Sequence, residues 1–159
     1  MNPNRVPEWV RALAYEHGDN NPVFIMIKSI TISDLNHQQQ NRLLIPSRYA
    51  ANLIAMLSEH EKDAANLLQP TARRNVPSTS RAQGRNHGGL DVCVYPQNRF
   101  ISYLMLTRWD ASGSIVIKGK DYSWLLSCSY LRENDEVELW GFRKGEERKL
   151  CFALVKKAH

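Results

Sequence analysis

The stretch DEVELWGFRKGEERKLCFALVKK, residues 135–157, decides the fold class of this chain. Two apolar or alternating runs flank the polar segment KGEER, and this is the pattern of a β-hairpin. In the first run, Glu136 and Glu138 alternate with Val137 and Leu139. Because successive side chains of a strand point to opposite faces, we expect the two glutamates on a solvated face and their apolar neighbours inside.

Five runs upstream of the hairpin have the same character. They are rich in β-branched and apolar residues, and turn residues separate them. The runs are VFIMIKSITI (23–32), RLLIP (42–46), LDVCVYP (90–96), FISYLMLT (100–107) and SIVIKG (114–119). Many short strands with frequent turn signals predict a small closed or half-closed β-barrel.

Three further segments have the pattern of short helices, namely EWVRALAYEH (8–17), SRYAANLIAML (47–57) and DYSWLLSCSYL (121–131). Helical spacing places Trp9, Val10 and Leu13 on one face of the first segment. Ser47 is a suitable cap for the second segment, because its hydroxyl can accept from a backbone N–H of the first turn. The polar stretch EHEKDAANLL (59–68) either continues the second helix or begins another.

The formal net charge of +5 is concentrated in one polar segment. Residues 70–89 contain four arginines and no acidic residue, and they have no hydrophobic period. We therefore expect a flexible basic insert there, either a solvated loop or a second tail that contacts phosphates. The predicted organisation is an N-terminal helix and turn over 1–22 and a barrel domain over 23–157. This charge distribution permits nucleic acid as a partner without requiring it.

The sequence carries no arrangement of residues typical of an active site. It has no GxSxG nucleophile elbow, no Gly-rich phosphate loop and no HExxH motif. The three cysteines lie far apart without zinc-finger spacing, so we expect reduced, buried thiols. Asp135, Glu136 and Glu138 form an acidic cluster that offers a metal site, and a solvated strand face is the simpler interpretation. We predict a protein that is not an enzyme and has no cofactor or metal.

The order of several motifs resembles that of the plant B3 domain. KSITISDLN and NRLLIP (28–46) are similar to the opening of that family, RWDASGSIVIKG (108–119) to its Trp-Asn-Ser-Ser loop, and LRENDEVELWGFR with KLCFAL (131–154) to its closing strands. PEWV and MLSEHEKDA further resemble one plant branch, a domain of unknown function close to the reproductive-meristem group. The resemblance spans residues 7–157.

The resemblance implies a mainly-β fold, an open seven-stranded barrel or pseudobarrel with two short flanking helices, here with an extra N-terminal helix. It also implies two loops that grip the major groove of double-stranded DNA. By motif position, the first loop and the strand before it supply Lys28, Asn36, His37, Gln38, Gln39, Gln40, Asn41 and Arg42. The second loop supplies Arg108, Trp109, Asp110, Ala111, Ser112, Gly113 and Ser114. The implied function is that of a DNA-binding module of a plant nuclear transcriptional regulator, with no membrane and no small-molecule substrate as partner.

The residue types in these loops suit DNA by their own chemistry. Amide side chains bond adenine in a bidentate way, arginine forks onto guanine or anchors a phosphate, and the serines reach phosphate oxygens. Two alternatives stay open for Arg42, which either holds the loop in register or grips a phosphate. Trp109 either packs over the barrel edge or touches a base. The sequence HQQQN taken alone also fits a solvated turn.

Several positions depart from the family pattern. The first loop carries glutamines where many members have lysine, and Ser47 follows Pro46 in place of another lysine. Asp110 replaces the usual asparagine and puts a negative charge near the expected phosphates. Asn134 replaces a glycine, a mild change because asparagine tolerates left-handed backbone. The lysine-poor loops and Asp110 favour an alternative function, a protein-interaction module on the same barrel with weak or lost DNA binding.

Overall fold

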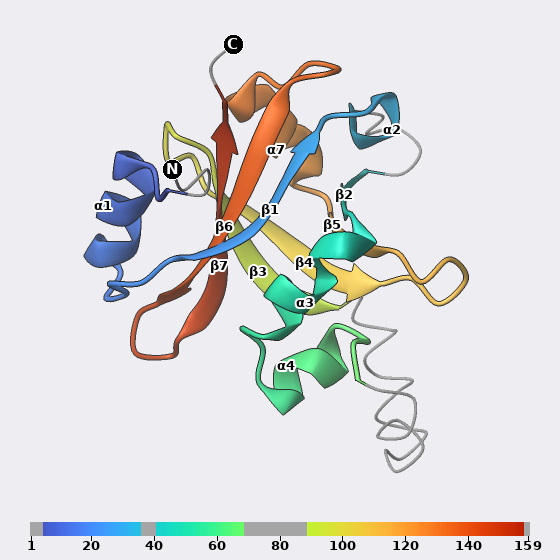
Figure 1. Cartoon of the computed structure of the whole chain (residues 1–159), viewed down its shortest axis with the longest axis horizontal. Helices are drawn as coiled ribbons and strands as arrows, with labels where there is room; N and C mark the ends of the chain where they lie inside the picture. Colours follow the sequence, from blue (N-terminus) through green and yellow to red (C-terminus); the bar gives the residue numbers. More distant parts are fainter. Residues whose placement is uncertain (1–4, 36–40, 69–88, 158–159) are drawn as a thin grey trace.

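A computed structural model describes residues 5–35, 41–68 and 89–157 (Figure 1). Within these ranges, strands form one seven-stranded sheet in the order β1-β6-β7-β3-β4-β5-β2. The sheet curls into an open barrel, and all its neighbouring strands are antiparallel except β3 and β7. The mainly-β pseudobarrel is therefore confirmed. The strands are β1 (Val23–Ser29), β2 (Arg42–Ile45), β3 (Leu90–Tyr95), β4 (Ser102–Arg108), β5 (Ile115–Lys118), β6 (Glu136–Lys144) and β7 (Lys149–Lys156).

One helix, α1 (Glu8–Glu16), precedes β1, and short helical segments occupy connections between strands, namely α2 (Ile32–Leu35), η1 (Ser47–Tyr49), α3 (Ala50–Ile54), α4 (Glu59–Ala64) and α7 (Tyr122–Ser129). The prediction that Ser47 caps a helix is wrong, because Ser47 is the first residue of the 3-10 turn η1 and not an N-cap. The capping side chain is Ser58, which accepts from Glu61 N while Glu61 accepts from Ser58 N. Residues 59–64 thus begin a separate helix. None of the helices in the described residues is long and apolar enough to cross a membrane.

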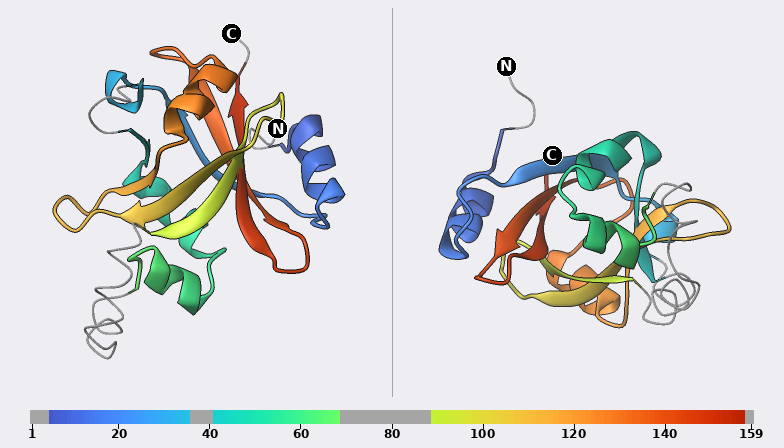
Figure 2. Two further views of the ribbon diagram at one scale, coloured as in Figure 1. Left: turned by 180° about the vertical axis from the view of Figure 1, so that it is seen from behind. Right: turned by 90° about the horizontal axis from the view of Figure 1, so that it is seen from below.

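The sheet buries apolar side chains on both of its faces. Inside the barrel, Phe152 belongs to a large cluster to which every strand contributes. On the outer face, α1 lies against β6 and covers a second cluster that includes Phe142 (Figure 2). Val10 and Leu13 are among the buried residues of α1, with Trp9 packed at the edge of the cluster. The predicted apolar face of the first helix is confirmed.

The barrel is open between its edge strands, β1 and β2, and a buried carboxylate bridges them. Lys28 on β1 places its Nζ 2.8 Å from one oxygen of Asp34 and 3.0 Å from the other. Arg42 on β2 donates from Nη1 to Asp34 at 2.8 Å, and the amide of Leu44 donates to it at 3.2 Å. Lys28 also donates to the carbonyl of Leu44 at 2.9 Å. One acidic side chain therefore joins strands that have no backbone pairing in the described residues.

Asp34 lies on α2, a helical turn that follows β1. Its side chain accepts from the amide and hydroxyl of Thr31, which fixes the turn locally. Tyr122 on α7 donates its hydroxyl to the backbone carbonyl of Asp34. Burial raises the pKa of Asp34, but the hydrogen bonds from Lys28, Thr31 and Leu44 outweigh it and hold the pKa below its usual value. The carboxylate is charged and fully buried.

The closing hairpin, β6 and β7, confirms the two predicted strands. The predicted exposure of one of its side chains is wrong. Glu136 is exposed as expected, whereas Glu138 is fully buried on the outer face of β6. Trp140 donates its indole N–H to Glu138 at 3.1 Å, and Lys157 contacts the other carboxylate oxygen at 3.2 Å. The solvated strand face predicted for Glu138 is therefore wrong, because a tryptophan from the same face covers it. The described residues contain no group of metal-ligating side chains.

We expect Asp34→Asn to lower the free energy of unfolding by about 3–5 kcal/mol, because it leaves Lys28 and Arg42 buried without a counter-charge. Chemical denaturation at neutral pH measures this difference. Glu59→Gln is the matched control, since it removes the surface pair with Lys62 and costs less than about 1 kcal/mol. Equal effects of the two substitutions would show that the bridge does not hold the barrel.

The contribution of Asp34 has a definite pH dependence. Its pKa is lower in the folded chain than in the unfolded chain, so the stabilisation is present above about pH 4 and disappears as the pH falls through the folded pKa. The stability difference between the wild type and Asp34→Asn should therefore shrink in acid. A difference that stays constant from pH 7 to pH 2 would contradict this assignment.

Candidate nucleic-acid interface

Two loops leave the barrel at opposite ends of β2. The first connects β1 to β2 and enters the strand at Arg42, which pairs with Lys118 of β5. The second connects β4 to β5 and enters β5 at Ile115, which pairs with Ile45 at the far end of β2. Figure 1 shows α2, β2 and the β4–β5 connection on the side of the barrel away from α1. The β2 strand and its neighbour β5 thus set the spacing between the loops.

The second loop is a closed turn held by its own backbone. The amide of Trp109 donates to Ser114 at 2.9 Å, and the amide of Gly113 donates to Trp109 at 2.8 Å. Gly113 has φ +73°, a left-handed conformation that glycine adopts without strain. The amide of Ser114 donates to the hydroxyl of Ser112 at 3.2 Å, and Ala111 and Ser112 are exposed at the tip. The tip residues therefore face solvent from a fixed base.

The residues that directly follow α4 anchor the second loop. Asn66 donates from Nδ2 to the carbonyl of Arg108 at 2.9 Å and to the carboxylate of Asp110 at 2.8 Å. The amide of Arg108 donates to Ala65 at 2.9 Å. The acidic residue that departs from the family pattern thus has a structural contact within the protein. Trp109 is half-buried at the same junction.

The base of the first loop is tied to β5 and to the Asp34 bridge. Asn41 donates from Nδ2 to the carbonyl of Gly119 at 2.8 Å. Lys28 and Arg42, both predicted to contact DNA, are buried, and their cationic groups contact Asp34. Of the two roles left open for Arg42, the geometry is that of a residue that holds the loop. The remaining predicted residues of this loop, Asn36, His37, Gln38, Gln39 and Gln40, lie outside the described residues.

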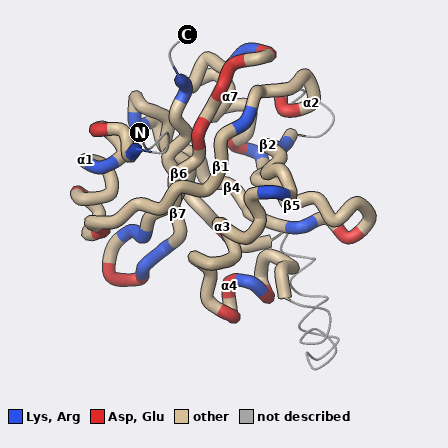
Figure 3. The backbone as a smooth tube through the Cα atoms, viewed as in Figure 1, with Lys and Arg blue, Asp and Glu red and all other residues tan. Residues whose placement is uncertain are grey.

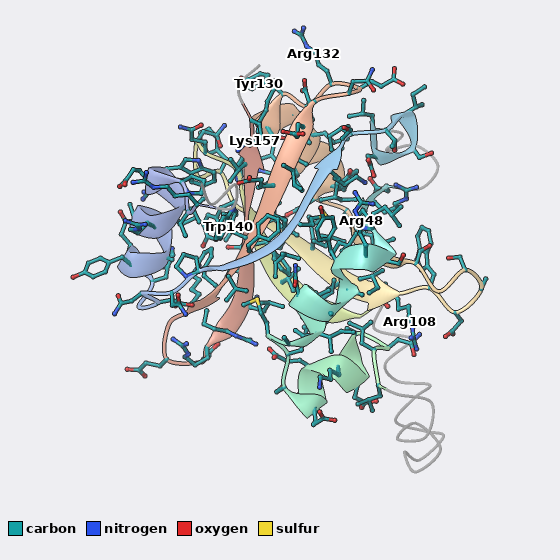
Figure 4. All side chains as sticks on the ribbon, in the orientation of Figure 1. Arg48, Arg108, Tyr130, Arg132, Trp140 and Lys157 are labelled. Atoms are coloured by element: carbon teal, nitrogen blue, oxygen red, sulfur yellow. The ribbon has the colours of Figure 1, made fainter. Side chains whose placement is uncertain are left out.

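A groove of about 420 Å³ separates the second loop from η1 and α3. Its walls include Ser47 on one side and Arg108, Ser112 and Ser114 on the other. Arg48, next to Ser47, is exposed and lies with its guanidinium 4.8 Å from the Tyr49 ring. Figure 4 shows Arg48 and Arg108 on the same side of the barrel, and Figure 3 shows the mixed charge of this side. The arrangement offers cationic groups and hydroxyls at the rim of a concave surface, which suits phosphate oxygens.

Sequence reasoning missed Arg48. Two residues separate it from Ile45, the last residue of β2, and the lysine expected just after Pro46 is absent. A signal was present, because the 3-10 turn after Pro46 carries a basic residue one position later than the family pattern predicts.

A comparison with protein-family models identifies the family of this chain. The model for B3 domain-containing protein At2g31720-like matches residues 2–158. The chain belongs to this B3 family. The resemblance seen in the motifs is therefore confirmed, and the family is one of DNA-binding domains rather than of enzymes.

Among solved structures, the B3 domain is similar to the chain in the Arabidopsis FUS3–DNA complex. The two share 12% sequence identity with a TM-score of 0.47, and the match covers 86% of this chain and 99% of that chain. A comparison with curated proteins gives no match.

We expect Asn66→Asp to loosen the second loop of this B3 domain without unfolding the barrel. The substitution keeps the side-chain shape but replaces the donor to Arg108 and Asp110 with an acceptor. Losing two hydrogen bonds of about 1 kcal/mol each should speed amide exchange at Trp109 and Gly113 roughly tenfold or more. Asn98→Asp, which removes a comparable bond to the carbonyl of Cys128, is the control. Unchanged exchange at both amides would rule out the anchoring role of Asn66.

Proposed function

We propose that this B3 domain binds double-stranded DNA with the loops at the two ends of β2 placed against the major groove. The observation that carries the proposal is the pair of loops with separately fixed bases, one tied through Asn41 to β5 and the other through Asn66 to α4. Contacts held by ordered strands are positioned before the ligand arrives, which reduces the entropic cost of binding. Membership of the B3 family supports DNA as the ligand.

Within this proposal, the residues divide by role. Arg48 and Arg108 contact phosphates, and so do the hydroxyls of Ser112 and Ser114. Lys28 and Arg42 act as positioning residues, because both cationic groups are buried against Asp34. Base edges are read by the amide side chains of the first loop, Asn36, Gln38, Gln39, Gln40 and Asn41, with His37 and Trp109 as further candidates.

The biological role that follows is regulation of transcription in a plant nucleus. A module of this size reads a short site, and the number of cationic groups at the rim is small. Because phosphate contacts supply much of the affinity of such proteins and each adds about one unit to the salt slope, we expect modest affinity and a shallow dependence on salt.

The first test is a salt series of fluorescence anisotropy with duplexes selected from a random pool. Arg48→Ala and Arg108→Ala should each weaken binding to selected and scrambled duplexes alike and lower the salt slope by about one unit. Arg11→Ala, an exposed arginine on α1 at the other side of the barrel, is the charge-matched control and should change neither quantity. No binding of the wild type at low salt to any duplex would refute the proposal.

A second test separates base reading from anchoring. Gln38→Ala and Gln39→Ala should each cost about 1–3 kcal/mol on the selected duplex and leave binding to scrambled duplexes nearly unchanged. Equal losses on both kinds of duplex would remove these glutamines from the set of base-reading residues.

The second candidate function is a protein-interaction module with weak or lost DNA binding. Asp110 favours it, because this carboxylate stays at the interface and repels phosphates. If the wild type binds no duplex but retains a partner protein through residues 109–114, this candidate replaces the first.

A further inference from the structure

A second groove, of about 720 Å³, lies on the outer face of the sheet. It runs across β3, β4 and β5 and reaches the start of β7, on the side that the left view of Figure 2 presents. Its lining includes Tyr103 and Met105, whose neighbours Leu104 and Leu106 point into the barrel core. The alternation of β4 therefore turns these two side chains outward. Tyr103 is 59% exposed, so its side chain lies open to solvent in this groove.

Three lysines line this groove, Lys118 and Lys120 near one end and Lys149 near the other. The described residues contain no ion pair for any of the three. Lys149 lies with its Nζ 5.8 Å from the centre of the Tyr103 ring.

Two acidic residues, Asp91 and Asp121, share the groove. The carboxylate of Asp121 accepts from the amide of Tyr103 at 2.9 Å, so part of its hydrogen-bonding capacity is used inside the protein. Three lysines against two aspartates leave the groove with a net positive charge of one.

The positive end of the groove is continuous with the first loop. Lys118 pairs in register with Arg42, the residue at which that loop enters β2. Gly119, between the two lysines, accepts the hydrogen bond from Asn41 at the base of the loop. If the first loop holds a DNA duplex, the base pairs beyond this contact would therefore lie next to Lys118 and Lys120.

We propose that this lysine groove binds the phosphate backbone of the same duplex, beyond the base pairs gripped by the two loops. The inference rests on the proposed DNA binding and extends it to a second contact surface. From β5 to β7 there are three strand spacings, roughly 14 Å, which corresponds to about four base pairs of duplex. The groove thus lengthens the binding site at one end, the end next to the first loop.

The test compares a short duplex that just supports binding with duplexes extended by six base pairs at one end or the other. For the wild type, extension at one end should steepen the salt slope by about three units, one for each lysine of the groove, and extension at the other end should not. Lys118→Gln with Lys120→Gln should reduce this increase to about one unit and leave the slope on the short duplex unchanged. Glutamine keeps most of the side-chain length, so packing on β5 is retained.

Two controls exclude a general effect of charge loss and unfolding of the variants. Arg5→Gln with Arg11→Gln removes the same charge next to α1, away from the loops, and should behave like the wild type. A thermal melt of each variant shows that the barrel is folded. Lys149→Gln should reduce the slope only on the extended duplex, by about one unit.

The results distinguish a failure of DNA binding from a failure of the groove contact. If the wild type binds no duplex at all, the proposed function itself fails. If it binds the short duplex and extension changes the slope at neither end, or changes it equally in the Lys118→Gln/Lys120→Gln variant, the groove proposal is overturned. The groove proposal also fails if a polyglutamate peptide binds the wild type and not the variant while the duplex slopes stay equal, because the groove then takes an acidic protein segment.

Discussion

Within the part of the chain that the structure describes, the two edge strands of the sheet, β1 and β2, are joined by the carboxylate of Asp34 and not by backbone pairing. Lys28 reaches it from one strand, and Arg42 and the amide of Leu44 reach it from the other. A buried charge is stable only while its partners stay in place, so the strands cannot separate without leaving three charged groups poorly solvated. Because Asp34 sits on the α2 turn between these strands, the same contact fixes where the first loop leaves the barrel and where it returns.

This constraint also changes which charges are available to a ligand. Lys28 and Arg42 look like binding residues in the sequence, yet both are buried and paired with Asp34 within the fold. The cationic groups at the surface come from other elements, Arg48 on η1 and Arg108 at the end of β4. The second loop follows a similar principle, since Asn66 donates to both the carbonyl of Arg108 and the carboxylate of Asp110 and thereby orders the turn.

Most of the correct predictions depend on residues that lie close together in the sequence. The hairpin over 135–157 and the face of α1 were predictable, because a period of two or of 3.6 residues is a local property. The left-handed backbone expected at Asn134 is also a local property, and Asn134 adopts φ +72° at the turn where the family has glycine. Glu138 was not predictable, because the periodic pattern says which face a residue points to and not whether Trp140 and Lys157 cover that face.

Strand content, barrel class and B3 membership follow from local periodicity and from motifs in a fixed order, so they can be predicted without a structure. The roles of the charged residues depend on the folded arrangement. Lys28, Asp34 and Arg42 meet only when the sheet curls and brings its edges together, and Asn66 meets Asp110 only when α4 packs beside β4. The lysine groove likewise forms only after β7, β3, β4 and β5 align in register. Burial and charge pairing are properties of the closed surface, and no linear pattern specifies them.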